Sequence, residues 1–191
     1  MTLPQRVLDL WFAGNPHASR QVWFQRDDAF DAGLRRELGE AAASAAAGAL
    51  DAWGEAPEGA LALVLLLDQL PRNLHRGSPE AFAADPAARQ QARRAVLERR
   101  FDLRLTPVQR AFLYLPFEHS EAMAEQDLSV VLFEGLRDAP GMAAPGGMVD
   151  FAWRHWQVIR RFGRFPHRNA VLGRHSAPAE AAYLAAEGAG F

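Results

Sequence analysis

The sequence contains no cysteine, and this absence excludes two kinds of site. No disulfide bond can form, and no metal centre can be built on thiolate ligands. A chain without cysteine agrees best with a cytoplasmic location, because small extracellular domains commonly depend on disulfides. Lysine is absent as well, so that all 21 basic residues are arginine, and the formal net charge is −2.

Long apolar runs are also missing. The longest, residues 60–67, is far too short to cross a bilayer. Residues 1–12 include Asp9 and no small-residue cleavage site, which is not typical of a signal peptide. The slightly negative net charge predicts no general attraction to nucleic acid or to anionic lipid. Residues 151–175 hold six arginines and no acidic residue. Solvated helix faces and an internal anion site explain these arginines more simply than nucleic-acid binding does. We therefore expect neither a membrane nor a nucleic-acid partner.

Alternating runs of β-branched residues are nearly absent, whereas helix starts recur along the chain. The sequence Thr106-Pro107-Val108-Gln109 is typical of a capping box with proline at the first helical position. Asp27 or Asp28 is expected to start a long helix that ends at Gly48. With 49% hydrophobic residues, the sequence predicts one all-α domain over residues 1–191. The expected seven to nine helices lie near residues 4–13, 27–47, 57–70, 79–83, 86–100, 107–114, 118–137, 148–163 and 178–187.

Helical spacing predicts polar side chains in the interior of this domain. Residues 60–67 are apolar on every side and are expected to form the central buried helix, directly followed by Asp68 and Gln69. In the helix expected at 148–163, His155 shares the apolar face. In the helix expected at 118–137, spacing places His119 and Gln126 in one apolar stripe with Met123, Val130 and Phe133.

The familiar catalytic and cofactor motifs are not present. There is no HExxH, no Glu-x-x-His of the di-iron type, no GxGxxG, no phosphate-binding loop and no GxSxG. His119 and Glu121 are two residues apart and would lie on different faces of a helix. Ser120 follows His119 directly, so their side chains would diverge. We therefore expect no metal and no cofactor.

Four separated segments resemble a known family, the bacterial proteins called DUF924. The resemblance extends over about residues 5–185 and implies an α-helical, tetratricopeptide-repeat-like array, in a family that has no assigned function. One departure is Ala177, where the family pattern has a threonine that could form a capping box with Glu180. The matching segments are LDLWF (8–12), LLLDQLPRNLHRG (65–77), FLYLPFEHSEAMAEQ (112–126) and RFGRFPHRNAVLGR (161–174).

The resemblance also singles out a set of polar residues, which His155 joins by its helical spacing. Pro71 and Pro166 are each expected to end a helix, so that the arginine and asparagine that follow can turn inward. The matching residues are Asp68, Gln69, Arg72, Asn73, Glu118, His119, Ser120, Glu121, Gln126, Arg164, His167, Arg168 and Asn169.

These residues fall into three candidate groups by their chemistry. Arginine forks suit a carboxylate or phosphate, which gives the candidate ligand-binding residues Arg72, Arg164, His167 and Arg168. Groups that could exchange protons near neutral pH are the candidate catalytic residues Glu118, His119, Glu121 and His155. Polar groups at helix ends commonly satisfy free backbone groups, which gives the candidate structural residues Asp68, Gln69, Asn73, Gln126 and Asn169.

Three functions agree with this pattern. The first is a cytoplasmic binding protein for a small anionic metabolite. The second is a hydrolase or lyase that uses the same cluster for acid–base chemistry. The third is a protein-interaction module, as tetratricopeptide-like folds often are, in which the polar core is purely structural. The sequence leaves open whether the protein is an enzyme and whether it has a protein partner.

Overall fold

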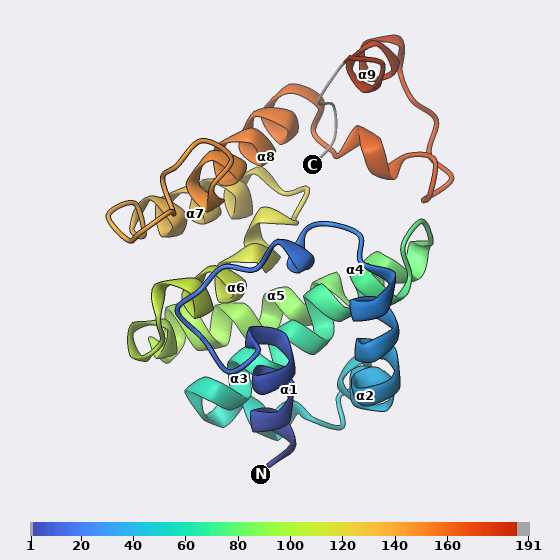
Figure 1. The fold of residues 1–191 in the computed structure, drawn as a ribbon. Coiled ribbons are helices and arrows are strands. Elements are labelled where there is room, and N and C mark those ends of the chain that lie inside the picture. Colours follow the sequence, from blue (N-terminus) through green and yellow to red (C-terminus); the bar gives the residue numbers. More distant parts are fainter. Residues whose placement is uncertain (1, 187–191) are drawn as a thin grey trace. The chain divides into compact units, whose positions relative to one another are not determined.

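The helix starts that the sequence predicts are present in the structure, a computed structural model that describes residues 2–186 (Figure 1). At the start of α2 (Asp28–Ala46), the Asp27 carboxylate accepts a hydrogen bond of 2.8 Å from the Phe30 amide. At the start of α6 (Pro107–Glu118), the Thr106 hydroxyl and the Gln109 side chain each accept from the other residue's backbone amide. These capping groups satisfy amides that a helix leaves unpaired at its first turn.

The described residues form helices and short helical turns with no strand, which confirms the all-α fold class. The other α-helices are α1 (Leu3–Phe12), α3 (Pro57–Val64), α4 (Leu70–Leu74), α5 (Asp85–Arg93), α7 (Met123–Glu134), α8 (Met148–Phe162) and α9 (Pro178–Leu184). The 3₁₀ turns are η1 (Gln21–Trp23), η2 (Asp51–Glu55), η4 (Pro79–Phe82), η6 (Phe101–Arg104) and η7 (Pro166–Arg168), and the π turns are η3 (Leu65–Gln69) and η5 (Arg94–Glu98).

The apolar run at residues 60–67 forms the central buried helix that the sequence predicts, since every residue in it is at most 1% exposed. The prediction that Pro71 ends this helix is wrong, because α3, η3 and α4 follow one another without a break up to Leu74. The wider π turn η3, in which the Leu70 amide bonds to the Leu65 carbonyl, ends at Gln69, with only Leu70 between it and Pro71. A π turn loosens the backbone where the proline ring would otherwise clash, so the helix continues.

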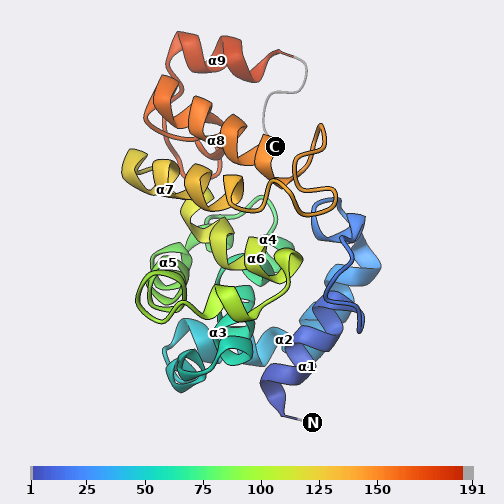
Figure 2. The same ribbon diagram turned by 90° about the vertical axis from the view of Figure 1, so that its left-hand side faces the viewer.

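The chain divides into two compact units. In the first unit, residues 2–76 and 80–116, α3 packs against α1 and α5, and α2 packs against α4. In the second unit, residues 77–79 and 117–186, α7 and α8 lie side by side, and α9 contacts η7 (Figure 2). The expectation that the whole chain is a single domain stays a prediction.

The helix expected at residues 118–137 is divided in the structure, so this prediction is wrong in its first part. α6 continues past Pro116 to Glu118, and α7 begins only at Met123. The Gln126 side chain donates two hydrogen bonds of 2.6 Å, to the carbonyls of Glu118 and Ser120, which satisfies acceptors at the end of α6. Gln126 is buried as predicted, but His119 lies half-buried in the connection rather than on α7.

The segment after α8 also differs from the expectation at Pro166. α8 ends at Phe162, and Gly163 adopts the left-handed conformation (φ +69°) that commonly closes a helix. Pro166 then starts η7 rather than ending a helix, as suits a residue with fixed φ and no amide hydrogen. At the start of α9, Ala177 offers no side-chain cap, but its amide donates to Glu180 over 2.7 Å, so half of the capping-box pattern is retained.

Candidate functional site

The polar residues singled out in the sequence divide between the two units. Asp68, Gln69, Arg72 and Asn73 lie in the first unit, on η3 and α4. The remaining candidates lie in the second unit, on the end of α6, in the connection from His119 to Ala122, on α7 and α8, and in the segment from Arg164 to Asn169.

In the first unit, Arg72 is held by two carboxylates. Its Nη1 and Nη2 donate to the two carboxylate oxygens of Asp85 over 2.8 and 3.1 Å, and Nη1 also lies 3.3 Å from Asp68 Oδ1. Burial lowers the pKa of Arg72, but the two carboxylates outweigh it and raise the pKa above its usual value. This geometry supports a structural role. Asp85 was not among the residues predicted from the sequence, where it is visible only as the start of α5.

The other residues of this group have polar partners within the first unit. The Asn73 side chain on α4 donates to Asp31 Oδ1 on α2 over 2.7 Å. The Gln69 side chain donates to Asp68 Oδ2 over 2.6 Å, and Asp68 is fully buried. These contacts agree with the structural roles proposed for Asp68, Gln69 and Asn73, because buried polar groups need partners.

In the second unit, Arg164 forms a bidentate ion pair with Glu180 on α9. The Nε–Oε1 and Nη2–Oε2 distances are 2.6 and 2.7 Å, and Nη2 also donates to the His175 carbonyl over 2.9 Å. Arg164 together with the Ala177 amide lowers the pKa of Glu180 to about 2. Asn169 donates to Ser176 Oγ over 3.1 Å. Arg164 and Asn169 therefore tie the segment after α8 to the start of α9.

Glu121 makes a second pair of this kind, with Arg174. The two side chains are joined by hydrogen bonds of 2.7 and 2.9 Å, and Glu121 Oε1 also accepts from the Phe165 amide over 2.8 Å. Burial raises the pKa of Glu121, but Arg174 and the Phe165 amide outweigh it, and the pKa lies below its usual value. These contacts favour a structural role for Glu121, whose proposed catalytic role stays a prediction. Arg174 was missing from the predicted set.

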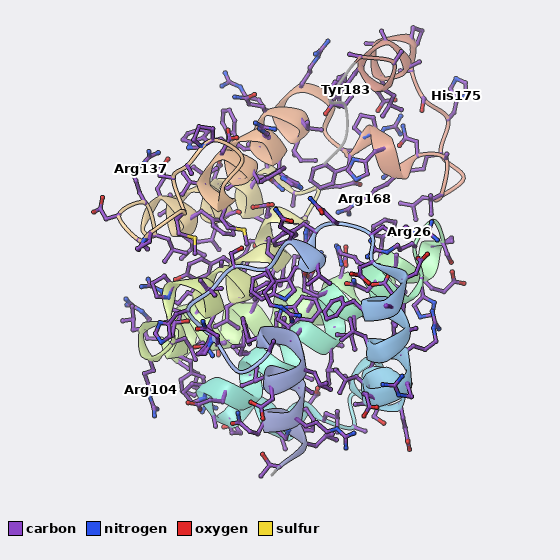
Figure 3. All side chains as sticks on the ribbon, in the orientation of Figure 1. Arg26, Arg104, Arg137, Arg168, His175 and Tyr183 are labelled. Carbon is purple, nitrogen blue, oxygen red and sulfur yellow. The ribbon has the colours of Figure 1, made fainter. Side chains whose placement is uncertain are left out.

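The other candidates gather around one fully buried ring, that of Phe165. The His155 ring lies 5.4 Å and the His167 ring 5.5 Å from it, measured between ring centroids. The Arg168 guanidinium carbon lies 4.5 Å above the same ring, and Arg168 is on η7, in the segment that follows α8 (Figure 3). The His119 ring lies next to the His155 ring, with 6.3 Å between the ring centroids. We call His119, His155, His167 and Arg168 the imidazole–arginine cluster.

Glu118 orients one member of this cluster. His155 Nδ1 lies 2.9 Å from the Phe151 carbonyl oxygen and 3.1 Å from Glu118 Oε1. Because the carbonyl can only accept, we assign the proton of the neutral ring to Nδ1, which leaves the lone pair on Nε2. His155 is 6% exposed, as its helical spacing predicts, and Glu118 is 2% exposed.

The surroundings of the cluster disfavour further positive charge. Burial is the largest cause that lowers the pKa of His155 well below its usual value, and His119, Arg168 and His167 lower it further. Burial and then Arg168 lower the pKa of His167 to about 4, against the opposing effect of Glu121. Both imidazoles are therefore neutral at pH 7, and a negative charge beside them would be favoured.

Over residues 2–186, no group of three or more histidine, aspartate or glutamate side chains could hold a metal ion. Within that range, no helix is both long and apolar enough to pass through a bilayer.

Fold and site together define an all-α protein with an imidazole–arginine cluster in its second unit. Residues 7–188 match the family described as a bacterial protein of unknown function, DUF924, and the chain belongs to this family. A solved structure of a protein of unknown function, ATU0120 from Agrobacterium tumefaciens, is 38% identical. The match covers 96% of this chain and 97% of that chain, with a TM-score of 0.86. No curated protein matches the sequence.

Proposed function

We propose that this chain is a cytoplasmic binding protein for a small anionic ligand, held by the imidazole–arginine cluster. The supporting observation is that two imidazoles, His155 and His167, and the Arg168 guanidinium lie around Phe165, with His119 beside His155. Burial first, and then the neighbouring basic groups, lower the pKa of His155 and His167. A ligand that carries negative charge is attracted to Arg168 and favours protonation of the neighbouring imidazoles, whereas a neutral ligand does neither.

Three members of the cluster have defined roles in this proposal. Arg168 supplies the permanent positive charge, and its position over the Phe165 ring fixes the plane in which its donors point. His155 and His167 are neutral in the free protein, and they take up protons as the ligand binds. Arg72 and Arg164 are not included, because their ion pairs with Asp85 and Glu180 support structural roles.

A thermal-shift screen of the full chain against mono-, di- and trivalent organic and inorganic anions tests this proposal. A ligand that binds only the native state raises the melting temperature. We expect Arg168→Gln to remove the shift given by a hit. Arg160→Gln is the matched control, since Arg160 also lies over an aromatic ring, 4.9 Å from Trp156, but outside the cluster.

Two results would overturn the proposal. One is a screen in which every hit keeps its shift in Arg168→Gln. The other is a screen without hits in which Arg168→Gln strongly lowers the melting temperature, because the cluster would then be a structural core. The second result would favour the interaction-module hypothesis and direct the search to protein partners.

A second candidate function, acid–base catalysis by a hydrolase or lyase, is favoured by the contact between Glu118 and His155. A carboxylate beside Nδ1 orients the imidazole and leaves Nε2 as the proton acceptor, an arrangement that general bases commonly use. The test is turnover of compounds related to a hit. We expect Glu118→Gln to lower kcat with little change in KM, and the pH–rate profile to follow the titration of an imidazole. A hit that stabilises the protein, with no turnover in any of its ester, amide and hydroxy-acid derivatives, would contradict catalysis and leave binding as the function.

A further inference from the structure

The first unit contains a cavity that is separate from the imidazole–arginine cluster. It has a volume of about 350 Å³ and lies where the first half of α2 meets the end of α4. The lining residues are Arg26, Asp28, Asp31, Ala32, Arg35, Asn73, Leu74 and Arg76.

Helical spacing explains why these residues meet. The residues at positions 28, 31, 32 and 35 occupy one face of α2 over two turns. Asn73 and Leu74 come from the end of α4, which packs against α2. Arg26 lies just ahead of α2, where Figure 3 labels it. The cavity is therefore built on two packed helices, which hold its walls in a defined position.

The Asp31 carboxylate is already engaged on this wall. Its oxygens accept from Arg76 Nε over 2.8 Å, from Arg76 Nη2 over 3.2 Å and from Asn73 Nδ2 over 2.7 Å. Burial raises the pKa of Asp31, but the bonds from Arg76 and Asn73 outweigh it and hold the pKa below its usual value. Asp31 therefore fixes Arg76 in place, and the positive charge of Arg76 balances the negative charge of Asp31.

The other two arginines make few side-chain hydrogen bonds to the described residues 2–186. Arg26 donates from Nε to Asp28 Oδ1 over 2.8 Å, and Arg35 donates from Nη2 to the Leu74 carbonyl. A guanidinium group has several N–H donors in a planar fork, so most donors of Arg26 and Arg35 point to solvent or to the cavity. Three arginines against two aspartates also leave the lining with a net positive charge.

We propose that this cavity is a second anion site, which binds the phosphate or carboxylate groups of a small non-aromatic metabolite through Arg26, Arg35 and Arg76. Guanidinium forks match both oxyanions in geometry and charge. The volume is at the lower end of the range for small-molecule sites, which is about 300–1,000 Å³. None of the lining residues is aromatic, so the cavity offers a nucleobase no ring on which to stack.

Isothermal titration calorimetry with inorganic phosphate and with citrate tests the site, and glycerol serves as the neutral probe. The titrations use full-length Arg168→Gln protein, so that binding at the imidazole–arginine cluster does not contribute. We expect Arg35→Gln to weaken binding of the preferred anion about tenfold, equivalent to about 1.4 kcal/mol. Arg36→Gln is the matched control, because Arg36 is exposed and neighbours Arg35 on α2 but does not line the cavity. Preference for phosphate or for citrate identifies the chemical group.

An independent readout follows the Asn73 side-chain amide by NMR in the unmodified protein. Binding in the cavity should shift this signal, whereas binding at the cluster alone should not, so failure of one site is distinguished from failure of the other. The proposal is wrong if Arg35→Gln and Arg36→Gln weaken binding equally, since that result indicates general screening of surface charge. It is also wrong if neither anion binds at millimolar concentration and the Asn73 signal stays unmoved.

Discussion

Glu118 Oε1 at the end of α6 lies 3.1 Å from His155 Nδ1 on α8, and both side chains are buried. Nδ1 also lies 2.9 Å from the Phe151 carbonyl, so the imidazole is oriented by two oxygen atoms. A buried imidazole held in one orientation suits either ligand binding or proton transfer. The low pKa of His155, caused first by burial, keeps the ring neutral at pH 7.

The depressed pKa values predict that stability decreases in mild acid. In the unfolded chain a histidine titrates near its usual pKa of 6.5, whereas His167 in the folded protein titrates at about 4. Between these values the unfolded state binds the proton first, so the free energy of unfolding falls as pH falls from about 6.5 to about 4. Urea denaturation at several pH values should show this slope.

Substitution of His167 tests whether this residue causes the pH dependence of the free energy of unfolding. We expect His167→Gln to reduce the dependence between pH 6.5 and 4, with the remainder coming from His155. His17→Gln, which substitutes an exposed histidine of the first unit, is the control and should preserve it. An identical slope in the unmodified protein and in His167→Gln would show that the proton uptake arises elsewhere.

Arg72 should prove to be a structural residue. Arg72→Met leaves the carboxylates of Asp68 and Asp85 buried without their shared cation, which should cost about 3 kcal/mol of unfolding free energy. The double variant Arg72→Met/Asp85→Asn should recover part of this loss, because one of the two charges is removed. A loss below about 0.5 kcal/mol in urea denaturation would contradict the structural role.

Substitution of Glu180 should lower stability without changing ligand binding. Glu180→Gln removes the charge that pairs with Arg164, so the melting temperature should fall while the response to an anionic hit is unchanged. The pKa of Glu180 is about 2, so its contribution is complete above the usual value of 4.5 and is lost as pH falls towards 2. Glu98→Gln, at an exposed position, is the control. Loss of the ligand response in Glu180→Gln would place Arg164 in the binding site after all.

Thr106 gives a test of the fold that does not involve either site. Its hydroxyl caps α6 and also donates to the Pro16 carbonyl over 2.6 Å. Thr106→Ala should therefore lower the free energy of unfolding by about 1–2 kcal/mol. Thr106→Ser retains the hydroxyl and should cost much less. Equal losses in the two variants would mean that the methyl group, not the cap, is what matters.

The parts of this structure that were predictable from the sequence depend on local patterns. His155 was placed in the interior because helical spacing aligns it with apolar residues, and the cap at Thr106 is a four-residue motif. The same spacing rule misplaced His119, because it extended one helix across the turn that Gln126 and Ser120 stabilise. The continuation of the helix past Pro71 is not predictable, because a π turn ahead of a proline leaves no clear mark in the sequence.

Ion pairs between residues far apart in the sequence could not be predicted from the sequence. The sequence gives no sign that Arg164 pairs with Glu180, which lies 16 residues further along the chain on another helix, and the ligand role of Arg164 stays a prediction. Glu121 and Arg174 are 53 residues apart, and no periodicity joins them. A charged residue at the end of a helix is equally compatible with a ligand and with an ion pair until the fold brings its partner near.

Anion binding by the imidazole–arginine cluster is tested most directly by an NMR titration of the His167 ring. The titration is run in sodium sulfate, in sodium chloride at equal ionic strength, and with the most stabilising anion of the screen. Sulfate keeps its charge throughout the pH range, so any change in the histidine reports on binding. The account predicts that the pKa of His167 rises from about 4 in the presence of sulfate or of the screened anion, because the bound negative charge favours the imidazolium. The same pKa in all three solutions would contradict it.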